Sequence, residues 1–556
     1  MKISRRQFTK TSAVTVTGLL LGCSLRNRFD LIIRNGMLLD GSGRTGIKTD
    51  LGIKGDRITA IVEDLRSSSA DMIIDAEGLM VAPGFIDIHT HTDSLLLVDP
   101  RALSKIMQGV TTEIGGNCGS SPFPLNDEDL QTVDRDFFEE YGIHADWRDI
   151  SSFFERLEKQ KISINFATLT GHGDLRAFIV GKNDVAPTSD QLQQMKIVLA
   201  TTMDQGSFGL STGLEYAPGS YAATDELIEL CKIVGQHKGV YATHMRNEDD
   251  KVEEAIAEAL QIGREAGVSL QISHLKACNK SNWSKVDHML EMIQQAAQEG
   301  LPVQADRYPY IAYGTGLSAF LPLKSRQGKN EEILSRLQDP GQLPQIEAYT
   351  RGRGERIGGW DRVVISSCYK DENKIWEGKS IAECAATRGI SEFEFIRTLL
   401  IKDELKAGIV GFAMDEEGLV KVLRSPLVMI GSDGDAVAPE GKLGAGKPHP
   451  RYYGTFPRVL GKYCREEHIF DLPTAVQKMT SLPAQKMGLR QRGLLQKGYF
   501  ADITVFNPQT VIDRATFVDP HQFPLGIEHV IVNGKLAVYK GKYTGVFAGA
   551  ILRFAG

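Results

Sequence analysis

The sequence predicts an α/β protein in which a (β/α)8 barrel is joined to a small β-sandwich built from both ends of the chain. Apolar strand-like runs alternate with helical patterns through the middle of the chain, and histidines follow several of those runs directly. Both ends carry short alternating strands separated by Gly-containing turns. We therefore assign residues 24–82 and 488–556 to the sandwich and residues 83–487 to the barrel.

The composition is that of an ordinary globular protein, and it argues against nucleic acid as a partner. Lys and Arg number 64 against 70 Asp and Glu, a formal net charge of −6, and no basic block is interleaved with aromatic residues. The 7 cysteines are scattered without a CxxC pair, which argues against a disulfide framework. Single cysteines are therefore free for other chemistry.

Residues 1–23 have the pattern of an export signal. Ser4–Lys10, SRRQFTK, is a twin-arginine sequence, and the apolar stretch that follows it is too short to span a bilayer. Leu19–Cys23, LLLGC, resembles the lipobox of bacterial lipoproteins, in which the cysteine becomes the lipidated first residue. We expect a periplasmic or cell-envelope lipoprotein whose only membrane contact is a lipid anchor at Cys23.

The two ends of the chain share one pattern of short strands and tight turns. Residues 30–81 contain alternating strands punctuated by Asn-Gly, Asp-Gly and Gly-Asp turns, and the C-terminal end repeats this pattern, with Asn533-Gly534 as a hairpin turn. Because both segments need a second layer to bury their apolar faces, we expect them to form one composite domain.

Eight apolar runs in the middle of the chain are the predicted barrel strands. They span residues 84–91, 110–115, 164–170, 209–212, 240–244, 269–274, 302–306 and 428–433. Between the last two runs, the segment 317–360 is too long for a simple loop and predicts a lid or insertion over the site. A further apolar run at 362–366 is a candidate strand of an insertion.

Side chains that bind metals stand where the predicted strands end, which is where barrel enzymes carry their active sites. His89 and His91 are two residues apart, so both imidazoles point to the same face of a strand. Imidazole and thiolate are borderline-soft ligands that suit Zn²⁺, and a carboxylate completes the set. The candidates are His89, His91, Cys118, His244, His274 and Asp433.

Motifs along nearly all of the mature chain resemble those of the D-aminoacylase (N-acyl-D-amino-acid deacylase) family of the amidohydrolase superfamily. They are APGFIDIHTHTD, GVTTEIGGNCGSSPFP, GLSTGLEYAPG, YATHMRNE, QISHLKA, DRYPY, IGSDGDA and HPRYYGTFPRVLGKY. The glycine-rich loop that carries Cys118 is the specific motif. Many relatives in the superfamily bridge two metals with a carbamylated lysine or a glutamate, whereas this branch uses a cysteine.

The resemblance implies a barrel of amidohydrolase type with a tight zinc site at Cys118, His244 and His274. It also implies a second, weaker metal site to which His89 and His91 contribute. Asp433 matches the aspartate that acts as the general acid and base. A carboxylate in that place can take a proton from the attacking water and return it to the leaving amine.

An N-acyl amino acid presents a free α-carboxylate, which calls for a cation near the metal. Lys276 lies two residues after His274 and shares its strand face if the strand continues. The resemblance places the lysine of HLK and the tyrosines of LEYAPG and DRYPY at this carboxylate; these are Lys276, Tyr216 and Tyr308. Arg246 and Arg451 are further candidates, with salt bridging as an equal alternative.

These features predict zinc-dependent hydrolysis of the linear amide of an N-acyl-D-amino acid, or of a dipeptide with a C-terminal D-residue. Two alternatives stay open. A cyclic amide hydrolase of the dihydroorotase or hydantoinase kind would more often show a lysine or other bridging ligand in place of Cys118. A non-catalytic barrel kept as a binding protein would be marked by loss of ligands, and here every expected ligand is present.

Overall fold

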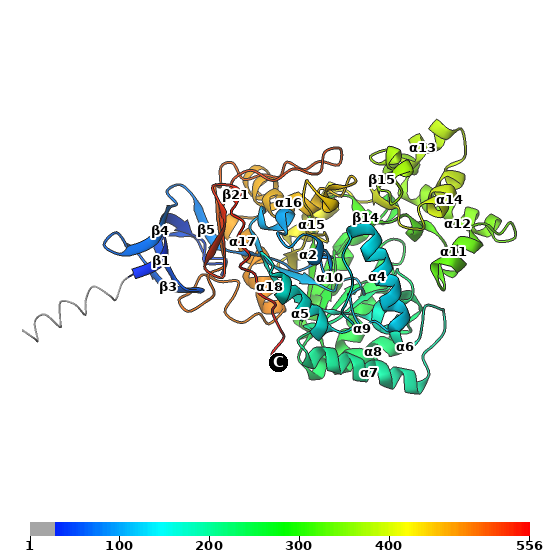
Figure 1. Cartoon of the computed structure of the whole chain (residues 1–556), viewed down its shortest axis with the longest axis horizontal. Helices are drawn as coiled ribbons and strands as arrows, with labels where there is room; N and C mark the ends of the chain where they lie inside the picture. Colours follow the sequence, from blue (N-terminus) through cyan, green and yellow to red (C-terminus); the bar gives the residue numbers. More distant parts are fainter. Residues whose placement is uncertain (1–27) are drawn as a thin grey trace, which may run out of the picture.

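The computed structural model describes residues 28–556, so the predicted signal and the lipobox cysteine lie outside the described residues (Figure 1). Within the described part, no helix has both the length and the apolar character needed to cross a membrane.

Parallel strands form the predicted barrel at the centre of the described chain. They are β6 (Phe85–Asp87), β7 (Val110–Gly115), β8 (Asn165–Thr168) continued by β9 (Thr170–Gly171), β10 (Gly209–Gly213), β11 (Val240–His244), β12 (Ser269–Ile272), β13 (Val303–Arg307) and β17 (Val428–Ile430). Pairing runs from β6 to β8 and from β9 to β17. A parallel bridge between Thr90 and Gly434 closes the ring. Each predicted run overlaps one of these strands, which confirms the barrel.

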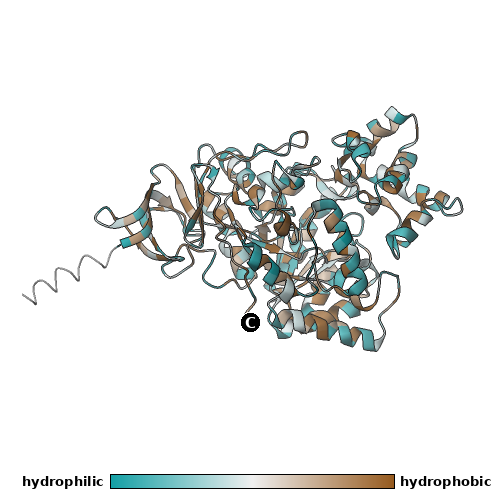
Figure 2. Ribbon diagram, viewed as in Figure 1, coloured by the Kyte–Doolittle hydropathy of each residue, from teal (hydrophilic) through white to brown (hydrophobic). Residues whose placement is uncertain are grey.

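Helices cover the outside of the barrel because each carries one apolar face. α9 (Val252–Ala266) buries Val252, Ala255, Ile256 and Ala259, the spacing of one helix face, and ends at Gly267, whose φ is +62°. Other covering helices are α5 (Ile150–Gln160), α7 (Ser189–Asp204), α8 (Thr224–Gln236), α10 (Val286–Gln298) and α15 (Glu416–Arg424). α4 (Asp127–Tyr141) is largely hydrophilic (Figure 2) and buries only Phe137.

Strands from both ends of the chain pair in one mixed sheet. Its members are β1 (Arg28–Leu38), β2 (Ile47–Lys54), β3 (Arg57–Val62), β4 (Ser69–Asp75), β5 (Met80–Pro83), β18 (Ile503–Phe506), β19 (Ile527–Val532), β20 (Lys535–Tyr539) and β21 (Lys542–Tyr543). β5 joins the two halves because it pairs with β1 on one side and with β18 on the other. Only Gly84 separates β5 from β6, so this sheet leads directly into the first barrel strand.

The segment between β13 and α15 forms a separate lobe (Figure 1). It contains β14 (Tyr313–Gly316), α11 (Asn330–Arg336), α12 (Leu343–Ile357), β15 (Val363–Ser367), α13 (Ile381–Arg388), α14 (Glu392–Lys402) and β16 (Gly408–Gly411). β16 pairs antiparallel with both β14 and β15, so the run at 362–366 is a strand of the insertion, as predicted. The lobe extends well beyond the predicted 317–360, because its own core includes Trp376 and Phe395.

Candidate metal centre

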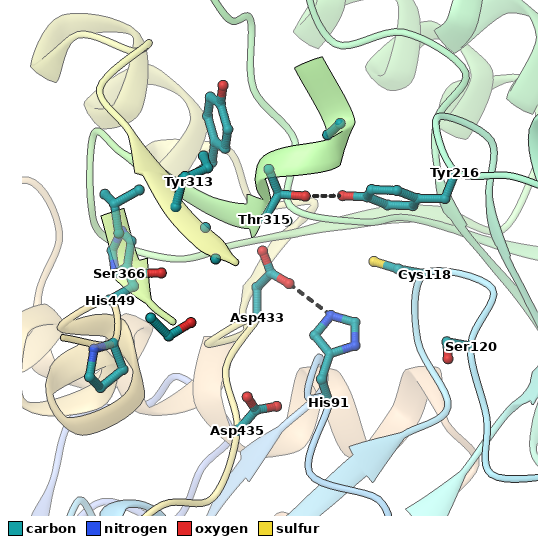
Figure 3. A pocket seen from close by; sticks show the side chains of 18 of the residues that line it. His91, Cys118, Ser120, Tyr216, Tyr313, Thr315, Ser366, Asp433, Asp435 and His449 are labelled. Atoms are coloured by element: carbon teal, nitrogen blue, oxygen red, sulfur yellow. Dashed lines mark hydrogen bonds and ion pairs between the residues drawn. The ribbon is translucent and has the colours of Figure 1, made fainter. Parts of the chain in front are cut away.

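The carboxyl ends of the barrel strands open into a cavity of about 960 Å³ (Figure 3). Strand ends and loops supply His91, Cys118, His244, His274 and Asp433 to its wall. The insertion supplies a further part of the wall, from β14, α12 and the segment between β15 and β16. Figure 3 shows Thr315 of the insertion facing Tyr216 on the side of the cavity opposite Asp433 and His91. The insertion therefore forms part of the wall of the same cavity as the predicted ligands.

The predicted ligands gather in two groups that share one cysteine. In the first group, Cys118 Sγ lies 3.3 Å from His89 Nε2, and Asp433 Oδ1 lies 3.0 Å from His91 Nε2. In the second, His274 Nε2 lies 3.4 Å from Cys118 Sγ and 3.0 Å from His244 Nδ1. The ligand atoms within each group all lie within 4.8 Å of one another.

This donor set fits zinc. A thiolate, imidazoles and a carboxylate are the ligands that Zn²⁺ prefers, at bond lengths of about 2.0–2.3 Å, and donors around one such ion lie about 3–4 Å apart. Because Cys118 belongs to both groups, its thiolate would contribute to both metal sites, as the sequence motif predicts. Cys118, His244 and His274 would hold one ion, while His89, His91 and Asp433 would complete the second site.

Three of these residues have left-handed backbone conformations. The φ angles are +51° at Cys118, +35° at His274 and +51° at Asp433. A non-glycine residue in this region is uncommon, and such conformations gather at functional sites, where surrounding contacts hold them. Each residue stands where the chain leaves a strand and turns across the mouth of the barrel.

Asp306 orients two of the ligands from below. Its Oδ1 lies 3.1 Å from His89 Nδ1 and accepts the backbone N–H of His274 at 2.9 Å, while its Oδ2 accepts from Gln271 Nε2. A carboxylate on the second ring nitrogen fixes the orientation of a metal-binding imidazole. The sequence predictions do not include Asp306, although this residue ends the seventh predicted strand, as the other candidates end theirs.

The charges of the site favour the anionic forms of the thiol and carboxyl ligands. Against the effect of burial, the same charges raise the pKa of the His89 and His244 imidazoles, which must lose that proton when they bind a metal. Burial disfavours the Cys118 thiolate, but the positive charges of His89 and His274 outweigh it and hold the pKa of Cys118 well below its ordinary value. Burial likewise opposes the Asp433 carboxylate, and Arg451, whose Nη1 lies 2.8 Å from Asp433 Oδ2, keeps the pKa of that carboxyl well below its usual range. Both groups are therefore anionic near neutral pH, as zinc ligation requires.

The three predicted carboxylate-binding residues differ in position. Lys276 and Tyr216 line the cavity, and Lys276 Nζ donates to Glu248 Oε1 at 2.6 Å. Tyr308 is fully buried and is not part of the cavity wall, because the guanidiniums of Arg307 and Arg451 lie over its ring. Its hydroxyl has no hydrogen-bond partner among residues 28–556.

Two acidic residues near the metal ligands escaped the sequence reasoning. Glu248 Oε1 lies 2.9 Å from His274 Nδ1, and Glu215 Oε2 lies 3.7 Å from His244 Nε2. Both belong to motifs already noted, LEYAPG and YATHMRNE, but neither follows its strand directly. Of the two arginines considered, Arg451 pairs with Asp433, and Arg246 pairs with Glu258 away from the cavity wall.

Comparison with known proteins agrees with the family resemblance of the sequence motifs. A model of the amidohydrolase family matches residues 72–135 and 424–538. The chain is 38% identical over 524 residues to the D-aminoacylase of Alcaligenes xylosoxydans xylosoxydans, covering 94% of this chain and 97% of that protein. It is 35% identical over 515 residues to the N-acyl-D-glutamate deacylase of the same organism, covering 92% of this chain and 94% of that protein.

Solved structures give the same result. The N-acyl-D-glutamate deacylase of Bordetella bronchiseptica, in complex with zinc and a phosphonate inhibitor, superposes with a TM-score of 0.79 at 33% identity, covering 95% of this chain and 100% of that one. A D-aminoacylase with a binuclear metal centre superposes with a TM-score of 0.79 at 36% identity, covering 94% and 100%. A D-hydantoinase at 17% identity and a TM-score of 0.53 shares the fold alone.

The fold and the site define a metal-dependent amidohydrolase. Within that superfamily, the extent and identity of these matches show that the chain belongs to the D-aminoacylase family, whose chemistry is the hydrolysis of linear amides.

Proposed function

We propose that this protein is a zinc-dependent deacylase that cleaves the linear amide bond of N-acyl-D-amino acids and releases the D-amino acid. The observation that carries the proposal is the convergence of six predicted ligands around the shared Cys118, five of them in the wall of one cavity. The chain belongs to a family whose relatives include an N-acyl-D-glutamate deacylase and an N-acyl-D-aspartate deacylase. Dipeptides with a C-terminal D-residue present the same scissile amide and carboxylate.

Zinc held by Cys118, His244 and His274 would supply Lewis acidity at the scissile carbonyl and an acidified water. Asp433 carries the proton transfer. Its Oδ2 is held by Arg451, while its Oδ1 faces His91 and the cavity. A carboxylate kept ionised by Arg451 can accept a proton from the attacking water and pass it to the amine as the C–N bond breaks.

Lys276 supplies the positive charge for the substrate's α-carboxylate. Its Nζ contacts Glu248 Oε1 and lies 2.9 Å from His274 Nδ1, so the cation stands beside a predicted ligand. Tyr216, whose ring centroid lies 4.8 Å from that of His244, directs its hydroxyl toward Thr315 on the insertion. Together these groups bind the carboxylate end of a substrate whose amide lies at the metal.

The activity is tested by amino-acid release from matched panels of N-acetyl-D and N-acetyl-L amino acids, with the zinc-loaded mature chain. We expect release from the D series only, and none from the Cys118→Ala and Asp433→Asn variants. Equal release from both series would contradict D-specificity. Hydrolysis of hydantoins or dihydropyrimidines, with the D series untouched, would support the cyclic-amide alternative instead.

We also propose that the protein is exported by the twin-arginine route and anchored through lipid at Cys23. The support is the twin-arginine sequence followed by LLLGC. Labelled palmitate should be incorporated into the full chain expressed in a bacterium that processes lipoproteins, and the Cys23→Ala variant should take up none. Equal labelling of the two chains would refute the anchor.

A further inference from the structure

A lysine is completely buried beneath the metal centre. Lys105, on the short helix α3 (Leu103–Ile106), has no solvent-exposed surface, and its Nζ contacts four oxygens. These are Asp87 Oδ2 at 2.9 Å, Glu113 Oε1 at 3.1 Å, Ser432 Oγ at 2.7 Å and the Gly434 carbonyl at 2.9 Å. A buried ammonium is tolerated only when it is paired and hydrogen-bonded in this way.

Two of these contacts flank the catalytic aspartate. Ser432 and Gly434 are the neighbours of Asp433, whose φ of +51° is a conformation that its own backbone does not favour. Ser432 Oγ in turn accepts the N–H of Gly434 at 3.1 Å. Lys105 therefore binds the chain on both sides of the strained residue without touching Asp433 itself.

The carboxylates paired with Lys105 extend this network to the strand that carries the histidines. Asp87 Oδ1 accepts the backbone N–H groups of Ser432 at 2.8 Å and His89 at 3.4 Å. Across the same seam, Asp433 N–H donates to the His89 carbonyl at 2.8 Å. This is where the first and last barrel strands meet, so Lys105 stands at the closure of the ring.

We propose that Lys105 is a positioning residue, which holds Asp433 and the His89–His91 strand end in the arrangement that proton transfer and the second metal require. The role of Lys105 in proton transfer rests on the proposed function, whereas its role in the second metal site does not. Without the ammonium, the turn at Ser432–Gly434 loses its two contacts to Nζ, and Asp87 and Glu113 are left as unpaired buried carboxylates. The group at Cys118, His244 and His274 has no direct contact with Lys105 and is expected to persist.

The test compares Lys105→Met with Lys478→Met. Lys478 is also buried, and its Nζ donates to the backbone carbonyls of Ser425 and Val428, at the opposite end of β17. Substitution of either lysine removes a buried cation beside the same strand. Only Lys105 reaches the carboxyl end, where the metal ligands stand.

Two readouts separate positioning from stability. The first is a Co²⁺ titration of the metal-free full chain, followed by absorbance. Lys105→Met should keep the tightly bound, thiolate-ligated Co²⁺ ion and lower the affinity for the second Co²⁺ ion at least tenfold.

The second is steady-state hydrolysis of an N-acetyl-D-amino acid. For Lys105→Met, kcat should fall about a hundredfold while KM changes less than threefold. Lys478→Met should lower Tm and leave both readouts unchanged.

Ser432→Ala keeps Lys105 paired and provides the decisive variant if Lys105→Met does not fold. It should lower kcat about tenfold at constant KM. The inference is overturned if the folded variants keep kcat and the second cobalt equivalent of the wild type, or if both lysine variants lose activity in proportion to their loss of Tm. If the wild type hydrolyses no N-acyl-D-amino acid, the proposed function fails, and the cobalt titration alone still supports or overturns the role of Lys105.

Discussion

At the scale of single residues, the site depends on a few side chains that each contact two other groups of the site. Cys118 belongs to both groups of ligands, and Asp306 supports both His89 and His274. Asp433 faces His91 with one oxygen and Arg451 with the other. A change at any of these positions therefore affects more than one contact, and its effects will not be additive with those of its neighbours.

Asp433→Asn tests the proton-transfer role directly. The amide keeps the size of the carboxylate but cannot accept a proton, so kcat for an N-acetyl-D-amino acid should fall by roughly 10²–10⁴, the usual contribution of a general base. Zinc bound by Cys118, His244 and His274 should remain, as measured by metal analysis after dialysis. A variant that keeps kcat within a few-fold of the wild type would remove Asp433 from the chemistry.

Glu113 gives the stability a defined pH dependence. Burial raises the pKa of Glu113 to about 7, against the opposing charge of Lys105, from an ordinary value of 4.5. Between about pH 5 and pH 7, Glu113 is therefore protonated in the folded state and ionised in the unfolded state. The free energy of unfolding falls as the pH rises through this window. Through this group the wild type should lose about 3 kcal/mol of unfolding free energy across that window.

Denaturant unfolding at several pH values measures this loss. The Glu113→Gln variant should lack that part of the slope, while the exposed control Glu331→Gln should retain it. If the Glu113→Gln and wild-type curves run parallel across the window, the pKa of Glu113 is not raised.

At the scale of elements, the sequence predicts the barrel because each strand is a short apolar run of neighbouring residues. The site residues stand at the carboxyl ends of these runs. Their spacing indicates His89 and His91, and the end of the eighth run indicates Asp433. The extent of the insertion was not readable, since β16 pairs with β14 and β15 across long stretches of chain, and each of these strands is short. Lys105 was missed for the same reason, because its partner Ser432 is 327 positions away.

Tyr308 shows a different limit. A motif gives the identity of a residue, whereas the direction of its side chain depends on what packs against it. Here the guanidinium groups of Arg307 and Arg451 pack over the Tyr308 ring and separate it from the cavity. Neither the spacing nor the periodicity of DRYPY contains that information.

Trp376→Ala tests the insertion as an independent element that shapes the cavity. Trp376 packs edge-on against Phe395, with 5.4 Å between ring centroids, in the core of the lobe. Removing it should destabilise the lobe by about 3–5 kcal/mol and raise KM, because β14 lines the cavity. Zinc binding should be unchanged, because the metal ligands lie on the barrel. A loss of bound zinc in this variant would show that the lobe and the metal centre are one unit.

At the scale of the whole molecule, the chain brings together parts that are distant in sequence. β5 lies between strands from both ends, and the first and last barrel strands meet at the seam that holds His89 and Asp433. The insertion borders the mouth of the barrel that this seam helps to form. The barrel therefore supplies the metal ligands with Lys276 and Tyr216, and the insertion supplies another part of the wall of the same cavity.

The central claim is that metal bound by these ligands makes the protein a D-specific deacylase, and zinc titration of the metal-free protein tests it most directly. Hydrolysis of one N-acetyl-D-amino acid, with its L-enantiomer as the control, is recorded as zinc is added. We predict that D-hydrolysis rises to its maximum near one equivalent per chain, while L-hydrolysis stays at background. Activity that is independent of zinc, or equal for the two enantiomers, would contradict the account.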